Sequence, residues 1–117
     1  MTLTRFDISP RMSQAIIHGD TVYLAGQVAD DWGADVKEQT RQVLAKIDDL
    51  LARTGSNRSR ILSAQVWLAD AREFDDMNEV WEAWVDPQSP PTRATCGPTL
   101  GHQHVRVEIT VIAALNG

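Results

Sequence analysis

The spacing of apolar residues switches along this chain between the 3.6-residue repeat of an α-helix and the two-residue repeat of a β-strand. Residues from about 35 to 53 follow the helical repeat, and Thr54-Gly55 predicts its end because glycine readily adopts a left-handed backbone. Asp70, with Glu73 three residues later, predicts a capping-box start for a second helix. The positions predicted to be buried are Val36, Thr40, Val43, Leu44, Ile47, Leu50 and Leu51 in the first helix, and Phe74, Met77, Val80, Trp81 and Trp84 in the second.

Short segments with strand-like composition lie before, between and after these helices. In chain order, the predicted strands cover residues 2–8, 15–17, 21–27, 61–69, 91–96 and 105–111. The last two are joined by a short loop rich in Gly, Pro and His and are predicted to pair as a hairpin. In the strand at 61–69, alternation predicts one core face formed by Leu62, Ala64, Val66 and Leu68.

The order of elements predicts a single α+β domain over residues 1–117, with a mixed sheet and two helices packed on one face. The opposite face would expose Trp67 and Ile112, so we expect something to cover it, and packing against other copies of the chain is the simplest cover. The other residues predicted to lie on that face are Ser63, Gln65, Arg93, Thr95, Arg106, Glu108 and Thr110.

The composition excludes several classes of protein. A net charge of −5 favours neither nucleic acid nor an anionic membrane as a partner. No apolar run resembles a signal peptide or approaches the roughly 20 residues that span a bilayer, so we expect a cytoplasmic protein. The single cysteine excludes an internal disulfide and a cysteine-based zinc cluster.

Arg93 and Glu108 are the candidate functional pair. Alternation places both on the non-apolar face of the predicted hairpin, roughly opposite each other. A fixed guanidinium beside a fixed carboxylate can hold a carboxylated substrate and activate a water next to it. The alternative is an exposed cross-strand salt bridge worth about 0.2–1 kcal/mol, and the residues taken alone favour that alternative.

Other reactive residues carry weaker signals. Cys96 alternates to the apolar face with Ala94, which favours a buried small hydrophobe over a nucleophile. His102 and His104 are too few for a metal centre, because three or four ligands are needed, so no metal is predicted. Trp32 lies in a polar loop, where it could pack on a neighbour or line the rim of a pocket.

Four stretches resemble the Rid family, also called RidA or YjgF, whose better-known members are enamine/imine deaminases. They are Ser13-Gln14-Ala15, Val22-Tyr23-Leu24-Ala25-Gly26-Gln27, Phe74-Asp75-Asp76-Met77-Asn78, and Pro91-Thr92-Arg93 followed by Val107-Glu108-Ile109. The resemblance implies a chorismate-mutase-like fold and a homotrimer whose sheets face inward, with a site in each cleft between subunits. It also favours a functional role for Arg93 over the salt-bridge alternative.

In active members, the arginine that matches Arg93 binds the substrate carboxylate and the glutamate that matches Glu108 positions the hydrolytic water. The resemblance also implies six substrate-binding residues, which are Met12, Ala25, Gly26, Asn78, Thr95 and Cys96. Two positions depart from the family pattern: Met12 stands where active members have tyrosine, and Ala25 where they usually have serine. Met12 cannot donate a hydrogen bond, so any contact that the tyrosine hydroxyl makes with substrate is absent here, while the carboxylate clamp at Arg93 is expected to be retained.

The resemblance therefore implies hydrolysis of 2-imino acids or their enamine tautomers to 2-keto acids and ammonia, resembling a 2-iminobutanoate/2-iminopropanoate deaminase. The expected partner is a small carboxylated imine, and no cofactor is needed. Two alternatives stay open. Met12 and Ala25 favour a trimer that binds small carboxylates without turnover, and a different enamine, such as an aminomuconate-like compound, would keep the chemistry but change the substrate.

Overall fold

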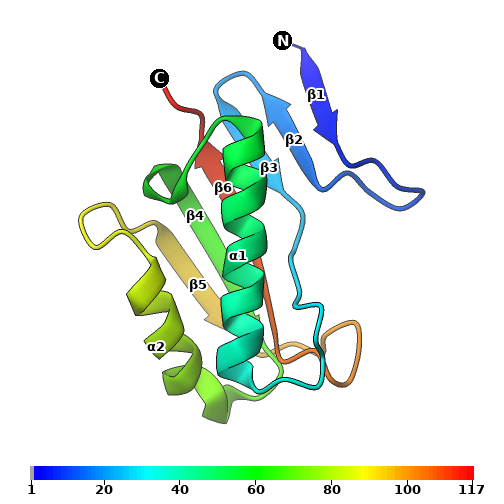
Figure 1. Cartoon of the computed structure of the whole chain (residues 1–117), viewed down its shortest axis with the longest axis vertical. Coiled ribbons are helices and arrows are strands. Elements are labelled where there is room, and N and C mark those ends of the chain that lie inside the picture. The colour runs from blue at the N-terminus through cyan, green and yellow to red at the C-terminus, as the bar shows by residue number, and fades with distance from the viewer. Residues whose placement is uncertain (1) are drawn as a thin grey trace.

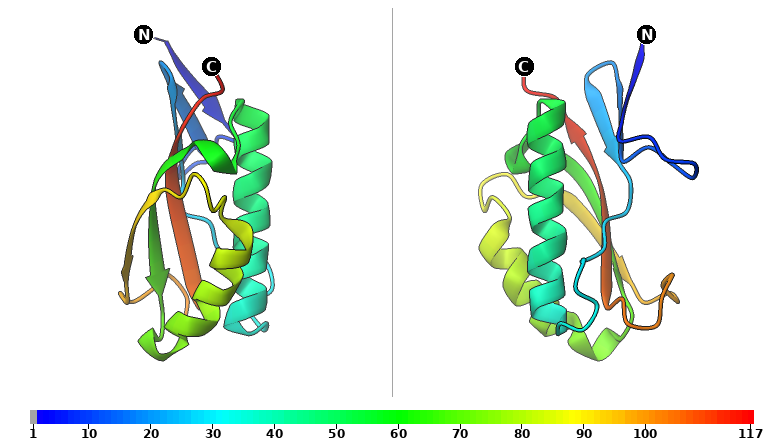
Figure 2. Two further views of the ribbon diagram at one scale, coloured as in Figure 1. Left: turned by 90° about the vertical axis from the view of Figure 1, so that its left-hand side faces the viewer. Right: turned by 45° about the vertical axis from the view of Figure 1, so that its right-hand side comes forward.

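The structure, a computed structural model, describes residues 2–117 as a six-stranded sheet with two helices on one face (Figure 1, Figure 2). This arrangement confirms the predicted α+β architecture. The strands follow the order β1-β2-β3-β6-β4-β5, and every neighbouring pair is antiparallel except β4 and β5. The elements are β1 (Leu3–Phe6), β2 (Ala15–His18), β3 (Thr21–Leu24), α1 (Val36–Thr54), β4 (Ile61–Leu68), α2 (Phe74–Trp84), β5 (Thr92–Cys96) and β6 (Val107–Ala114), with short 3₁₀ turns at Arg58–Arg60 and Ala71–Glu73.

Helix α1 begins and ends where the sequence predicts. The Asp35 side chain caps its first turn by accepting a hydrogen bond from the Glu38 backbone N–H. Gly55 ends it with φ of 90°, a backbone conformation that favours glycine. All seven residues of the predicted stripe are buried. No helix in residues 2–117 is long and apolar enough to cross a membrane.

The central strands β6 and β4 form the floor of the core. Alternate residues of β6 are buried under the helices, as predicted, and the residues between them are half-buried on the open face. In β4, a register shift between Ile61 and Ser63 interrupts the alternation. Ile61 is therefore buried and Leu62 is 52% exposed, so the prediction that Leu62 lies in the core is wrong.

Helix α2 begins later than the capping box predicts. Asp70 caps the 3₁₀ turn by accepting from the Arg72 backbone N–H, and the Glu73 side chain instead pairs with Arg106 at 3.1 Å. Phe74 then starts the helix and is 42% exposed, so the prediction that it is buried is wrong. Its ring packs under the Arg93 guanidinium and not into the core.

The predicted C-terminal hairpin is wrong, because β4 lies between β5 and β6. Helix α2 carries the chain back from the end of β4, so β5 pairs with β4 in parallel at the edge of the sheet. The connection that follows, residues 97–106, then crosses the end of β4 to reach β6 on its other side (Figure 1). Such a connection is longer than the 2–5 residues usual for a hairpin.

This strand order also reverses the predicted faces of β5. Arg93 lies opposite Ala64 and Thr95 opposite Val66, and both β4 partners are buried under the helices. Arg93 and Thr95 therefore lie on the helix-covered face, not on the open one. Cys96, predicted to be buried with the apolar residues, is exposed opposite Trp67.

Candidate active site

The Arg93 guanidinium is held between helix α2 and strand β5 with most of its donors free. One nitrogen, Nη1, donates to Asn78 Oδ1 at 2.7 Å, and the guanidinium carbon lies 5.3 Å and 5.8 Å from the ring centroids of Trp81 and Phe74. Burial lowers the pKa of Arg93, and the field of Glu82 opposes that change. Within residues 2–117, Arg93 forms no ion pair within 4 Å. A guanidinium stays charged in a protein, so its remaining donors can bind an external anion.

Glu108 lies on the open face of β6, opposite Trp67 of β4. Its carboxylate rests directly against the backbone of Gly26, where a Cβ atom would come within 2.1 Å of Glu108 Oε2. Burial raises the pKa of Glu108 above the ordinary value for a glutamate. A carboxylate that keeps its proton to higher pH is a stronger base once ionised, which suits proton transfer.

Substituting Gly26→Ala should displace the Glu108 carboxylate without unfolding the protein. The backbone of Gly26 is not in the left-handed region and the clashing atom is the end of a side chain, so the unfolding free energy should change by about 0.5 kcal/mol or less. The displaced carboxylate should be better hydrated, which lowers the pKa of Glu108 toward its ordinary value of about 4.3. A carbon-13 NMR titration of the glutamate carboxyls measures this change. Gly101→Ala is the control, because nothing lies within 4 Å of its added Cβ, and an unchanged Glu108 titration in Gly26→Ala would contradict the packing.

Gln27 holds the segment next to Glu108, and sequence reasoning did not select it as a site residue. It is only 6% exposed, and its Nε2 donates to the Ala25 carbonyl at 3.0 Å and to Gln14 Oε1 at 2.9 Å. Its backbone pairs with Ile109 of β6 in both directions. The amide thus fixes the peptide on either side of Gly26. No pattern in the sequence distinguishes a buried structural glutamine from an exposed one.

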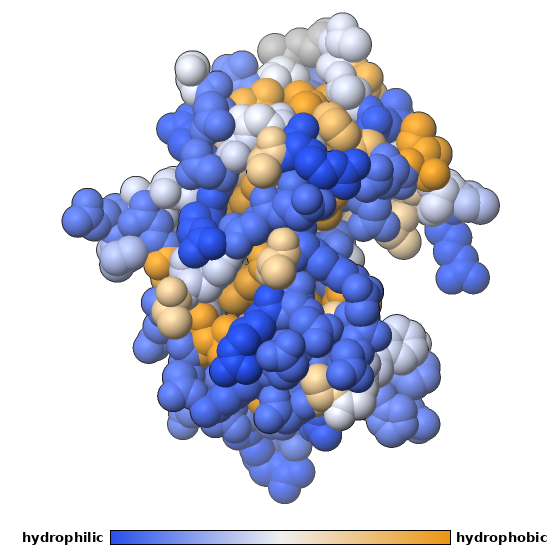
Figure 3. Space-filling view, in the orientation of Figure 1, coloured by the Kyte–Doolittle hydropathy of each residue, from blue (hydrophilic) through white to orange (hydrophobic). Residues whose placement is uncertain are grey.

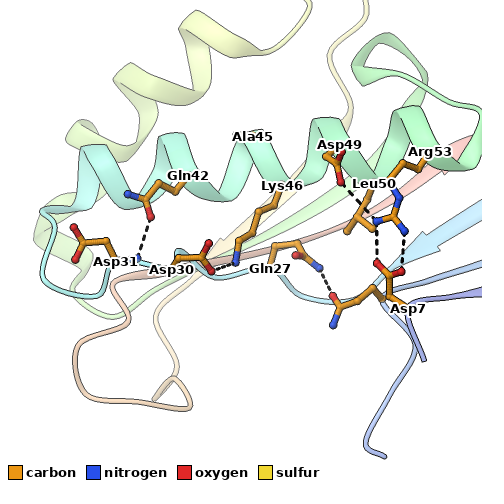
Figure 4. Close-up of a pocket in the computed structure, with 11 residues that line it drawn as sticks. Asp7, Gln27, Asp30, Asp31, Gln42, Ala45, Lys46, Asp49, Leu50 and Arg53 are labelled. Carbon is orange, nitrogen blue, oxygen red and sulfur yellow. Dashed lines mark hydrogen bonds and ion pairs between the residues drawn. The ribbon is translucent and has the colours of Figure 1, made fainter. Parts of the chain in front are cut away.

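Figure 4 shows Gln27 at a groove of about 780 Å³ between α1 and the segments that precede β2 and α1. The groove is crossed by ion pairs from Arg53 to Asp7 at 2.7 Å and from Lys46 to Asp30 at 2.7 Å. None of the predicted site residues lines it. The Asp7–Arg53 ion pair connects the segment before β2, which contains Met12, to helix α1.

The remaining predicted site residues lie around these two groups. Met12 is exposed in the loop before β2, where its backbone is bonded to Ser9, and the Ala25 N–H donates to the Gln14 carbonyl at 2.9 Å. Thr95 and Cys96 line a small cavity of about 290 Å³ at the end of β5. Within one chain, Arg93, Asn78 and Thr95 lie together on the helix side of the sheet, whereas Gly26 and its neighbour Ala25 lie beside Glu108.

The prediction that Arg93 and Glu108 stand side by side on one hairpin is therefore wrong within one chain. They occupy opposite faces of the sheet and are separated by strand β4. A single chain therefore holds the two candidate groups apart, with the Arg93 guanidinium beside α2 and the Glu108 carboxylate on the open face.

The loop of residues 97–106, which carries His102 and His104, forms no metal centre. In the described part of the chain, no group of three or more His, Cys, Asp or Glu side chains could hold an ion. Trp32 packs on His102 with ring centroids 4.2 Å apart, and it is one of the residues that line a cavity of about 450 Å³. Gln39 joins this loop to α1 by donating to the carbonyls of Trp32 and His104.

The chain is similar to known proteins over nearly its whole length. The family model described as Endoribonuclease L-PSP matches residues 2–115. A RutC family protein from Haemophilus influenzae is 46% identical over 114 residues, which cover 97% of this chain and 98% of that protein. The RutC family protein YoaB from Escherichia coli is 42% identical, covering 98% of this chain and 100% of that protein.

The crystal structure of a YjgF family member from Neisseria meningitidis superposes with a TM-score of 0.97 at 36% identity, covering 100% of this chain and 98% of that one. This agreement confirms the predicted fold class. Matches of this extent in both sequence and structure show that the chain belongs to the Rid (YjgF) family, whose model is described as Endoribonuclease L-PSP.

Proposed function

We propose that this protein hydrolyses 2-imino acids or their enamine tautomers to 2-keto acids and ammonia. The observation that carries the proposal is the half-buried Glu108 carboxylate, which is held against the backbone of Gly26 and has a raised pKa. Membership of the Rid family supports this class of chemistry. In the proposed site, Arg93 binds the substrate carboxylate, and Glu108 positions the water.

The Arg93 guanidinium suits the carboxylate because its planar fork donates two parallel hydrogen bonds. Asn78 accepts a hydrogen bond from Nη1, and packing on Phe74 and Trp81 restrains the plane of the guanidinium. The side chain therefore loses little conformational entropy when substrate binds. Thr95, two residues along the same face of β5, would line the bound substrate.

Glu108 acts first as a base and then as an acid. It takes a proton from the water whose oxygen attacks the carbon of the protonated imine, which gives a neutral tetrahedral aminoalcohol. It then gives this proton to the amino nitrogen. As the carbon–nitrogen bond breaks, the hydroxyl proton passes to the departing ammonia, so ammonium leaves and the keto acid remains. Positioning of water and imine supplies most of the rate enhancement that this reaction needs. Met12, Ala25, Gly26 and Cys96 would contact the substrate around this centre.

Because Arg93 and Glu108 lie on opposite faces of the sheet in one chain, a shared site for them requires a second subunit. We propose a homotrimer in which the open faces pack inward, so that Arg93 of one subunit lies near Glu108 of its neighbour. The open face supports this assembly because it carries Tyr23, Ile112 and Trp67, of which Tyr23 is exposed and the other two are half-buried.

Sedimentation tests the assembly directly. Wild-type protein should sediment as three 13.0 kDa chains at micromolar concentration. Ile112→Glu places a charge in the middle of the packed face and should dissociate the trimer. Ala83→Glu introduces the same charge on the exposed side of α2 and should leave the trimer intact. A wild-type monomer would contradict the trimer.

The activity is tested by generating imines with an amino-acid oxidase and trapping them with semicarbazide. The protein should compete with the trap, so the semicarbazone signal should fall as protein is added and keto acid should form in its place. An unchanged signal over a panel of amino acids would contradict the proposed hydrolysis.

Two alternatives remain distinct outcomes of that experiment. Binding of keto acids without turnover would favour a carboxylate-binding trimer, for which the thioether of Met12 in place of a hydroxyl is the supporting observation. Turnover only of an aminomuconate-like enamine would keep the chemistry and change the substrate. The family description also names a ribonuclease, but a chain of net charge −5 does not favour the binding of RNA.

A further inference from the structure

The cavity of about 290 Å³ lies next to the residue that would bind the substrate carboxylate. Arg93 and Thr95 are two positions apart on the same face of β5, which separates their Cα atoms by about 6.6 Å. Phe74 connects the two places, because its ring packs on the Arg93 guanidinium and also lines the cavity. A substrate whose carboxylate is held by Arg93 would therefore have its side chain within reach of this cavity.

The chemistry of the cavity wall is apolar and uncharged. No carboxylate or cationic group is among the residues that line it, which are Leu68, Ala71, Phe74, Thr95, Cys96 and Gly97. A charged side chain placed here would lose its hydration without gaining a partner. A volume of about 290 Å³ is just below the range of about 300–1,000 Å³ for small-molecule pockets, so it suits one side chain and not a whole larger ligand.

The surroundings disfavour acidic substrates in particular. Phe74 also lines a separate pocket, together with Asn78. The charged residues of that pocket are Asp75, Asp76, Glu79 and Glu82, with Lys37 as its single cation. Lys37 is already paired with Glu79. A second carboxylate on the substrate would meet this excess of negative charge, so the field would oppose its binding.

We propose that this cavity is the subsite for the substrate's side chain and that it selects imino acids with uncharged, apolar side chains larger than a methyl group. The inference rests on the proposed deaminase function. It assigns to Ala71 and Phe74 a role in choosing among imines, separate from the roles of Arg93 and Glu108 in binding and hydrolysing them.

The test is a comparison of imines that differ only in side chain, made from alanine, leucine and glutamate. Wild-type kcat/KM should be about tenfold or more higher for the leucine-derived imine than for the alanine-derived one, and lowest for the glutamate-derived one. Ala71→Leu adds bulk at an exposed position on the cavity wall. It should lower kcat/KM about tenfold for the leucine-derived imine and by less than about twofold for the alanine-derived one.

Ala83→Leu is the matched control, because it makes the same substitution on the exposed side of α2 and lines a different groove. It should leave all three rates unchanged. If Ala71→Leu affects every imine equally, or none of them, the subsite is overturned while the deaminase function stands.

Keto-acid binding separates the subsite from the catalytic proposal. By calorimetry, wild-type protein should bind 4-methyl-2-oxopentanoate more tightly than pyruvate, and Ala71→Leu should remove that preference. If no imine is turned over but the preference and its loss are observed, the deaminase function fails and the subsite is supported. Equal affinities for the two keto acids in wild-type protein would overturn the subsite, whatever the result of the activity assay.

Discussion

Replacing Arg93 with alanine should lower kcat/KM for a carboxylated imine by about 100-fold, equivalent to about 3 kcal/mol for a charge-assisted bidentate interaction. The loss should appear mainly as weaker substrate binding, because the carboxylate is held equally in the ground state and the transition state. The measurement is the rate of semicarbazone loss over a range of imine concentrations.

Two arginine variants make this result specific. Arg93→Lys keeps the charge but not the planar fork, so its kcat/KM should fall between wild type and alanine. Arg72→Ala removes an exposed arginine that forms an ion pair with Asp70 on the surface, and it should have wild-type activity. Equal imine hydrolysis by wild type and Arg93→Ala would contradict the role assigned to this guanidinium.

Replacing Glu108 with glutamine should lower kcat by about 10²- to 10⁴-fold, the usual contribution of a general acid–base group. The amide fills the same space beside Gly26 but cannot accept the proton of water, so keto-acid affinity should stay within a few-fold of wild type. The combination of intact binding and lost turnover distinguishes this outcome from misfolding. Turnover at the wild-type rate would show that another group activates the water.

The pH dependence of wild-type kcat/KM follows from the raised pKa of Glu108. The base must be ionised, so activity should fall as the pH decreases through that raised pKa, with a midpoint above the ordinary value of about 4.3. The residual activity of Glu108→Gln should lack this acidic limb. An acidic limb centred at the ordinary value would contradict the burial of the carboxyl.

The same shift predicts the opposite trend for stability. Because the native state holds the Glu108 proton more tightly than the unfolded state, it is relatively more stable below the ordinary carboxyl pKa and loses that increment as the pH rises through the raised pKa. Glu108→Gln should therefore be at least as stable as wild type at pH 7 and show no advantage at pH 3. Melting temperatures at the two pH values measure this difference.

Local patterns predicted the elements because each depends on residues close together in the chain. The stripe from Val36 to Leu51 needs only helical geometry and a core to bury it, and the Gly55 stop needs only a left-handed backbone. The alternation along β6 likewise assigned Glu108 to the open face correctly. Two predictions of buried residues failed for local reasons. The irregular strand pairing beside Leu62 shifts the alternation of β4 by one residue, and α2 starts about one turn later than predicted, at Phe74.

The sequence by itself determined the family, the class of fold, the two helices and the residues most suited to chemistry, Arg93 and Glu108. Only the tertiary structure decided how those two residues are related. The parallel return of β5 through α2 placed Arg93 under the helices, and the insertion of β4 between β5 and β6 separated it from Glu108. Strand order and strand direction depend on long-range packing, which no spacing of residues within one strand encodes. This is why two residues predicted to lie on one hairpin are found on opposite faces of the sheet.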